Sequence, residues 1–82
     1  MKFYNDIITV SRKQVELAIC IRQYRRIHDL SQKQMAEICS IYAEPYGVKF
    51  ANTEISNYEN YRIRPSAKKF QILMSAMDID KI

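Results

Sequence analysis

The residues best suited to chemistry are short polar side chains on one expected helix, over residues 52–60. They are Asn52, Thr53, Glu54, Asn57 and Asn60. Ile55 and Tyr58, three residues apart, would anchor the other face of that helix. An α-helix fits the major groove of DNA, where asparagine can bond adenine and a carboxylate can accept from cytosine. The alternative for any single helix of this kind is a solvent-exposed face, and for Glu54 the two interpretations weigh equally.

Basic residues follow this polar helix directly, at Arg62 and Arg64. A helix that reads bases, flanked by groups that hold phosphates, is the usual division of labour in helix-turn-helix proteins. The whole chain carries 13 Lys and Arg against nine Asp and Glu, a net charge of +4. This balance favours an anionic partner, and double-stranded DNA is the partner we expect.

Helix-start signals predict two helices before the polar helix over residues 52–60. Ser11 with Gln14 and Ser31 with Gln34 both have the spacing of a capping box. The first helix is therefore expected over residues 11–28, and the second is expected to begin at Ser31. Apolar residues at helical spacing predict one buried face on each helix. These are Leu17, Ala18, Ile21 and Ile27 on the first, and Met35, Ile38, Cys39 and Tyr42 on the second.

Helix-ending and helix-capping residues mark the bounds of two further helices. Pro45 and Gly47 should end the second helix, because proline cannot continue the helical hydrogen bonds and glycine tolerates a positive φ. Asn52 is expected to cap the third helix and Ser66 the fourth. The expected core is Ile21, Leu30, Met35, Ala36, Ile38, Ile55, Tyr58, Phe70, Leu73 and Met77.

A chain of 82 residues supports one hydrophobic core and hence one domain. We expect a short N-terminal arm over residues 1–10 and a compact all-α domain of four to five helices over residues 11–82. The arm is apolar at Phe3, Tyr4, Ile7 and Ile8. It could cover its own core, which we favour, or contact a partner.

Several of these motifs together resemble the phage-repressor type of helix-turn-helix (Cro-like and XRE-like). The segments that carry the resemblance are Ile21 to Arg25, Leu30 to Gln32, Met35 to Glu37, Ile55 to Asn60, Arg64 to Ser66 and Leu73 to Met77. The resemblance spans most of the chain and implies a lambda-repressor-like fold. It also implies a sequence-specific transcriptional regulator, a repressor or switch protein, that inserts residues 52–60 in the major groove.

The resemblance implies roles for particular residues. The base-facing positions correspond to Asn52, Thr53, Glu54 and Asn57. Arg25 and Glu59 match an ion pair that ties the first helix to the end of the third. Gln32 matches a position that contacts the DNA backbone and can brace the recognition helix. The side chains expected to hold phosphates are Gln32, Lys33, Lys49, Arg62 and Arg64.

Three features depart from that family pattern. The turn between the second and third helices is longer than usual, and its Tyr42, Tyr46 and Phe50 are expected to pack beneath it rather than to stack on bases or a partner. Tyr61 replaces the usual glycine, and since a left-handed backbone would strain tyrosine, this corner is expected to differ. No counterpart of the family's fifth helix, which often supplies dimer contacts, is expected, so we expect any homodimer to form otherwise.

A protein-binding module on the same fold, such as an antirepressor or antitoxin that grips a partner repressor or regulatory protein, is the alternative function. An enzyme is not expected, because His28 is the only histidine and no nucleophile and base are paired. The single glycine excludes a phosphate-cradling loop. Cys20 and Cys39 have no metal-ligand spacing, so neither a metal nor another cofactor is expected. Without a membrane-spanning or signal segment, the expected location is the cytoplasm.

Overall fold

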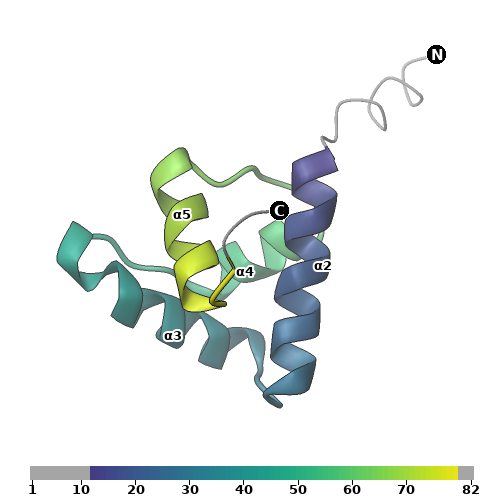
Figure 1. Cartoon of the computed structure of the whole chain (residues 1–82), viewed down its shortest axis with the longest axis horizontal. Coiled ribbons are helices and arrows are strands. Elements are labelled where there is room, and N and C mark those ends of the chain that lie inside the picture. The colour runs from purple at the N-terminus through teal and green to yellow at the C-terminus, as the bar shows by residue number, and fades with distance from the viewer. Residues whose placement is uncertain (1–11, 80–82) are drawn as a thin grey trace.

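The computed structural model describes residues 12–79, and the regular secondary structure in this range is all helical. It contains four α-helices and a short 3-10 helix, with no strand among the described residues (Figure 1). The expected all-α class is therefore confirmed. The expected arm over residues 1–10 and the capping box of Ser11 lie outside the described residues.

The first two α-helices are joined by a tight turn. Helix α2 covers Arg12–Ile27 and helix α3 covers Gln32–Ala43. The predicted capping box at the start of α3 is confirmed: the Gln34 N–H donates to Ser31 Oγ at 3.0 Å, and the Ser31 N–H donates to Gln34 Oε1 at 2.8 Å. Two backbone donors that the helix leaves without partners are thus satisfied locally.

Helix α3 leads into the 3-10 helix η1, over Glu44–Tyr46. The proline and glycine signals end the helix as predicted: Pro45 lies inside η1, and Gly47 has a left-handed φ of 71°. A loop then leads to helix α4, over Asn52–Glu59. Glycine fits the left-handed position because it lacks the Cβ that would clash there.

The predicted cap of α4 is wrong by one residue. Ala51 is the N-cap, with an extended backbone, and Asn52 is already helical. The reason is the side chain of Glu54, whose Oε1 accepts the Ala51 N–H at 3.0 Å. The carboxylate therefore supplies half of a capping box, and the helix starts without a capping side chain at Asn52.

Helix α5 covers Ala67–Ala76, and its predicted cap is confirmed. The Lys69 N–H donates to Ser66 Oγ at 3.2 Å. Ser66 follows Pro65, which disfavours helix in the residue before it. Helix is therefore disfavoured at Arg64, shortly before this cap.

Left-handed residues close three of the helices, and none of them is glycine. Asp29, Tyr61 and Asp78 have φ of 55°, 61° and 57°. After α4, the Arg62 N–H donates to the Asn57 carbonyl at 2.9 Å and the Tyr61 N–H to the Tyr58 carbonyl at 3.4 Å. This is a Schellman motif. The expectation that the corner at Tyr61 would differ is therefore wrong, because tyrosine adopts the strained conformation there.

The core lies where α2, α3, α4 and α5 meet. Its fully buried large side chains are Leu17, Ile21, Met35, Ile55, Leu73 and Cys39. Most of the predicted core is confirmed, although Leu30, Ile38 and Phe70 are only half-buried and pack against the core from its edge.

Two residues of the predicted apolar faces are exposed. Ile27, the last residue of α2, is 76% exposed, and Tyr42 is 48% exposed. Along α3 the buried stripe instead drifts through Ala36 and Cys39 to Ala43. A helix of 3.6 residues per turn brings Ala43 inward in the last turn and carries its neighbour Tyr42 out of the stripe.

Helix α4 is held between its neighbours. It packs on both α3 and α2, and α5 packs on α3 (Figure 1). The described residues include no helix with the length and apolar character needed to cross a bilayer.

Candidate nucleic-acid interface

Helix α4 has a buried side and a polar side. Ile55, Tyr58 and Glu59 are buried beneath it, whereas Asn52 and Thr53 at its first turn are exposed. Asn57 is half-buried. The predicted base-facing residues therefore lie on one short helix whose opposite face is anchored in the core.

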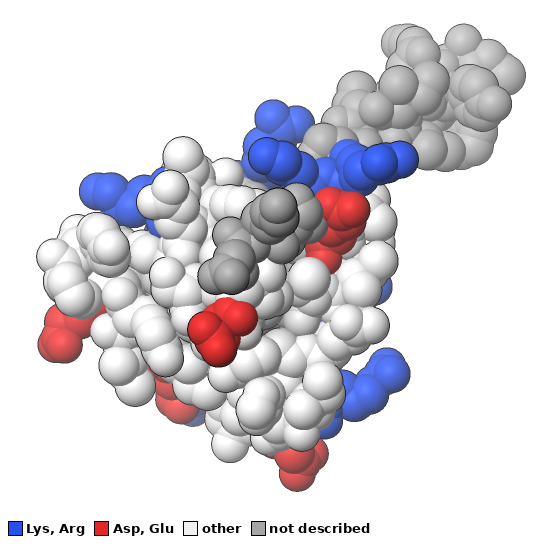
Figure 2. Space-filling view, viewed as in Figure 1, with Lys and Arg blue, Asp and Glu red and all other residues white. Residues whose placement is uncertain are grey.

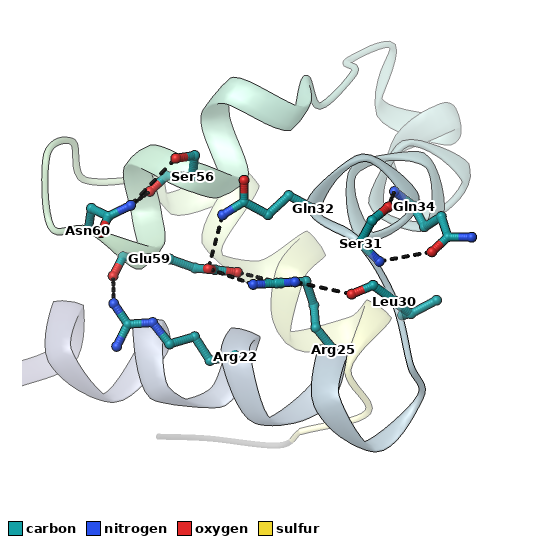
Figure 3. A network of polar contacts seen from close by, with 9 residues as sticks. All are labelled: Arg22, Arg25, Leu30, Ser31, Gln32, Gln34, Ser56, Glu59 and Asn60. Carbon is teal, nitrogen blue, oxygen red and sulfur yellow. Dashed lines mark hydrogen bonds and ion pairs between the residues drawn. The ribbon is translucent and has the colours of Figure 1, made fainter.

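Glu59, the last residue of α4, ties the end of this helix to α2 and α3. Its carboxylate forms the ion pair expected from the sequence, with Arg25 Nε at 2.7 Å from Oε2 and Arg25 Nη2 at 2.9 Å from Oε1 (Figure 3). Gln32 Nε2 also donates to Oε1, at 3.1 Å. Gln32 thus braces α4 from the start of α3, as the resemblance implies.

Two arginines of α2, Arg25 and Arg22, also donate to backbone carbonyl groups. Arg25 Nη1 donates to the Leu30 carbonyl at 3.1 Å, in the turn between α2 and α3. Arg22, whose role we did not predict, donates to the Glu59 carbonyl at the end of α4. The hydrogen bonds that Arg25 donates to Glu59 raise the pKa of Arg25 and outweigh the opposing effect of burial. Helices α2, α3 and α4 therefore share one charged network (Figure 3).

Glu54 has partners that neither sequence interpretation foresaw. Its Oε2 accepts from Lys69 Nζ at 2.5 Å and from the Tyr58 hydroxyl at 3.2 Å, while Oε1 holds the Ala51 N–H. Burial raises the pKa of Glu54, but the bonds from Lys69, Ala51 and Tyr58, with the charge of Lys69, lower it overall. The carboxylate is thus an ionised group held within the protein.

The predicted phosphate-binding residues lie in three places. Lys33 is exposed in the first turn of α3, and Lys49 is exposed in the loop before α4. Arg62 and Arg64 are exposed in the loop after α4, where the backbone bond from Arg62 to Asn57 holds the start of that loop against the helix. Of the predicted set, Gln32 is the member whose side chain is engaged in the Glu59 network.

Arg64 also belongs to a basic edge between α2 and α5. With Arg12 and Lys13 it lines an open groove of about 980 Å³ that has Leu17, Phe70 and Met74 at its apolar side. On the face shown in Figure 2, Lys and Arg gather where the beginnings of α2 and α5 lie. The sequence signal for this edge was the adjacent basic pair at the start of α2, which we did not assign to the site.

The long turn between α3 and α4 is closed by Ser40. Its Oγ accepts the Phe50 N–H at 2.9 Å and donates to the Phe50 carbonyl at 3.2 Å. Phe50 is buried, as expected, but Tyr42 and Tyr46 are 48% and 58% exposed. The prediction that both tyrosines pack beneath the turn is wrong, because the added residues extend α3 and η1 outward.

Among residues 12–79, no three metal-ligating side chains come together. Cys39 is buried, and burial raises the pKa of its thiol to about 12. His28 is exposed and stacks obliquely with Tyr24, their ring centres 4.3 Å apart.

Comparison of the chain with models of known protein families, with curated proteins and with solved structures gave no significant match.

Proposed function

We propose that this protein is a sequence-specific DNA-binding regulator, of repressor or switch type, that inserts α4 into the major groove. The observation that carries the proposal is the construction of α4. Its first turn presents exposed polar side chains, its buried face is locked by the Glu59 network, and a basic loop follows it directly. A helix whose buried face is fixed and whose exposed face is polar is suited to reading base edges.

The proposed roles divide along the same lines. Asn52, Thr53 and Asn57 read bases, because amide and hydroxyl groups match the donors and acceptors of the major groove. The exposed cations hold phosphates, and these are Lys33, Lys49, Arg62 and Arg64. Gln32 acts by bracing α4 through Glu59, in addition to any phosphate contact.

The resemblance to phage-repressor helix-turn-helix proteins supports this proposal through the order of α2, α3, α4 and α5. The Arg25–Glu59 ion pair, which that resemblance implies, supports it further. A homodimer on a symmetric operator, acting in the cytoplasm, is the form of regulator we propose. In a symmetric dimer both subunits would make the same modest set of contacts, and together these would give tight binding.

The division of roles is tested by comparing Asn57→Ala with Arg64→Ala on a selected site and on scrambled duplex. Asn57→Ala should weaken binding to the selected site and leave scrambled DNA unaffected, because base contacts carry the sequence preference. Arg64→Ala should weaken both and reduce the slope of log K against log salt by about 0.9. Arg26→Met removes an exposed charge at the end of α2 and serves as the control. Equal losses on both DNAs for Asn57→Ala would contradict the assignment.

A protein-binding module is the second candidate, and one observation favours it. Ile41, Tyr42 and Tyr46 are exposed together near the end of α3 and in η1, with Ile41 69% exposed. Exposed aromatic and aliphatic groups of this kind mark many protein contact sites. If the chain binds neither selected nor random DNA at low salt, while alanine at Tyr42 and Tyr46 abolishes a protein complex, this function replaces the first.

A further inference from the structure

Lys69 links α5 to the beginning of the candidate recognition helix. It is the third residue of α5, and its Nζ lies 2.5 Å from Glu54 Oε2. The same ammonium lies 4.9 Å from the centre of the Phe50 ring, in the segment that leads into α4. Lys69 and Glu54 are each about a quarter exposed, at 23% and 24% of their side chains. One cation therefore contacts both the helix and the segment before it.

Glu54 lies among exposed candidates for base contact, yet its oxygens face the protein. Asn52 and Thr53 precede it and are exposed. The Ala51 N–H, the Tyr58 hydroxyl and the Lys69 ammonium all donate to its carboxylate. A carboxylate without such partners at this position would repel phosphates and could accept from the cytosine amino group.

We propose that Lys69 is a positioning residue that withdraws Glu54 from the DNA and cancels its charge, so that base preference rests on Asn52, Thr53 and Asn57. The inference depends on the proposed function of α4. It assigns to α5 a part in specificity, since α5 supplies the cation that keeps Glu54, at a base-facing position, from contacting bases. Because the Glu54 carboxylate also accepts the Ala51 N–H, holding this carboxylate in place also fixes where α4 begins.

The competing role for Lys69 is direct contact with a phosphate. The two roles differ in how Lys69 and Glu54 depend on each other. A positioning cation matters because of the carboxylate, so its loss is repaired by removing the carboxylate charge. A phosphate contact is lost whatever occupies position 54. Double-mutant cycles measure this difference.

The cycle uses Lys69→Met, Glu54→Gln and the double variant, with Lys68→Met as the matched control. Lys68 is the exposed neighbour in the same turn, so its variant removes the same charge from the same helix. Lys69→Met should weaken binding to selected and scrambled DNA by roughly tenfold, a loss equivalent to about one logarithmic unit of affinity. Glu54→Gln should restore most of this loss in the Lys69→Met background, change little in the wild type, and leave any effect of Lys68→Met unrepaired.

Three binding results would overturn the inference. One is an equal effect of Glu54→Gln in both backgrounds, especially with a salt slope reduced by about 0.9, which would make Lys69 a phosphate contact. Another is full affinity in Lys69→Met. The third is a lost preference for cytosine at one position in Glu54→Gln, which would make Glu54 a base reader.

A measurement without DNA separates this inference from the proposed function. The Glu54 carboxyl is titrated by NMR in the wild type, in Lys69→Met and in Lys68→Met. Its neighbours with titratable groups are Lys69 and Tyr58, so the pKa should rise in Lys69→Met and stay unchanged in Lys68→Met. An unchanged pKa in Lys69→Met would refute the contact itself. A raised pKa in a protein that binds no DNA would instead refute the proposed function, and with it the part of Lys69 in specificity.

Discussion

Glu59 is the one charged side chain that is buried among residues 12–79, with 3% of its surface exposed. A buried carboxylate is costly unless its oxygens are paired and hydrogen-bonded. Arg25 and Gln32 meet this requirement from two different helices, and no buried side-chain polar atom in the described range lacks a partner. The charge therefore fixes the position of α4 through the cost of leaving it unpaired.

Arg25→Met should destabilise the protein by about 3 kcal/mol, because the substitution leaves Glu59 buried without a cation. Urea denaturation followed by circular dichroism measures the change. Arg26→Met, at the exposed neighbouring position, is the matched control and should change the free energy of unfolding by less than about 0.5 kcal/mol. A similar small loss for both variants would mean that the pair contributes no more than a surface contact.

At the scale of elements, the turn between α3 and α4 depends on one hydroxyl. Ser40→Ala should cost about 1 to 3 kcal/mol, because the Phe50 N–H and carbonyl both lose their partner in a partly buried position. Thermal unfolding of this variant and of Ser75→Ala, which changes an exposed serine in α5, provides the comparison. Equal melting temperatures for the two would show that the turn is held by other contacts.

The end of α4 stores strain at Tyr61, whose φ is 61°. Tyr61→Gly should be more stable than Tyr61→Ala by about 1 kcal/mol, because both lose the ring beside Arg22 but only glycine adopts this backbone freely.

The matched pair is Gln71→Gly and Gln71→Ala, at an exposed position within α5. There the order should reverse, with alanine about 1 kcal/mol more stable. The same order at both positions, measured by urea denaturation, would contradict the left-handed conformation of Tyr61.

Sequence predicted the helices well where the signal is local. The Ser31 box and the Ser66 cap involve residues three apart, so spacing alone identifies them. The cap of α4 was misplaced because Ala51 has no capping side chain and depends on Glu54 reaching back. Tyr42 was misplaced because a helical repeat shows which residues share a face, but not how far neighbouring helices cover it.

The candidate site was harder to predict, because its contacts join distant residues. Arg25 and Glu59 are 34 positions apart, and only the resemblance to a known family suggested that they meet. Lys69 and Glu54, 15 positions apart, carry no signal in spacing or composition. Their contact depends on how α4 and α5 are placed by their packing on α3, which no local pattern encodes.

At the scale of the whole molecule, stability rests on one small core shared by four helices. Leu73→Ala should cost about 2 to 5 kcal/mol, because Leu73 is fully buried and truncation leaves a cavity. Ile41→Ala, at a largely exposed apolar position, is the control and should cost less than about 0.5 kcal/mol. Comparable midpoints in urea would mean that α5 is not part of the core.

At this scale, the charge distribution bears on the proposed DNA binding but not on which sequence would be read. The net charge of +4 is spread over several elements, with Arg12, Lys13 and Arg64 along the groove between α2 and α5. In the proposed function, such charges accelerate association and raise affinity for any duplex, whereas sequence preference comes from α4. The affinity for random DNA should therefore fall steeply as salt increases. The affinity for a selected site should keep a sequence-dependent part at high salt.

Selection of binding sites from a random duplex pool at low salt, followed by anisotropy titration of the winner against scrambled DNA, tests the central claim most directly. The proposed function predicts an enriched motif bound at least about a thousandfold more tightly than the scrambled sequence. A symmetric dimer would make that motif an inverted repeat with half-sites about one helical turn apart. No enrichment, with only weak and salt-sensitive binding, would contradict sequence-specific regulation through α4.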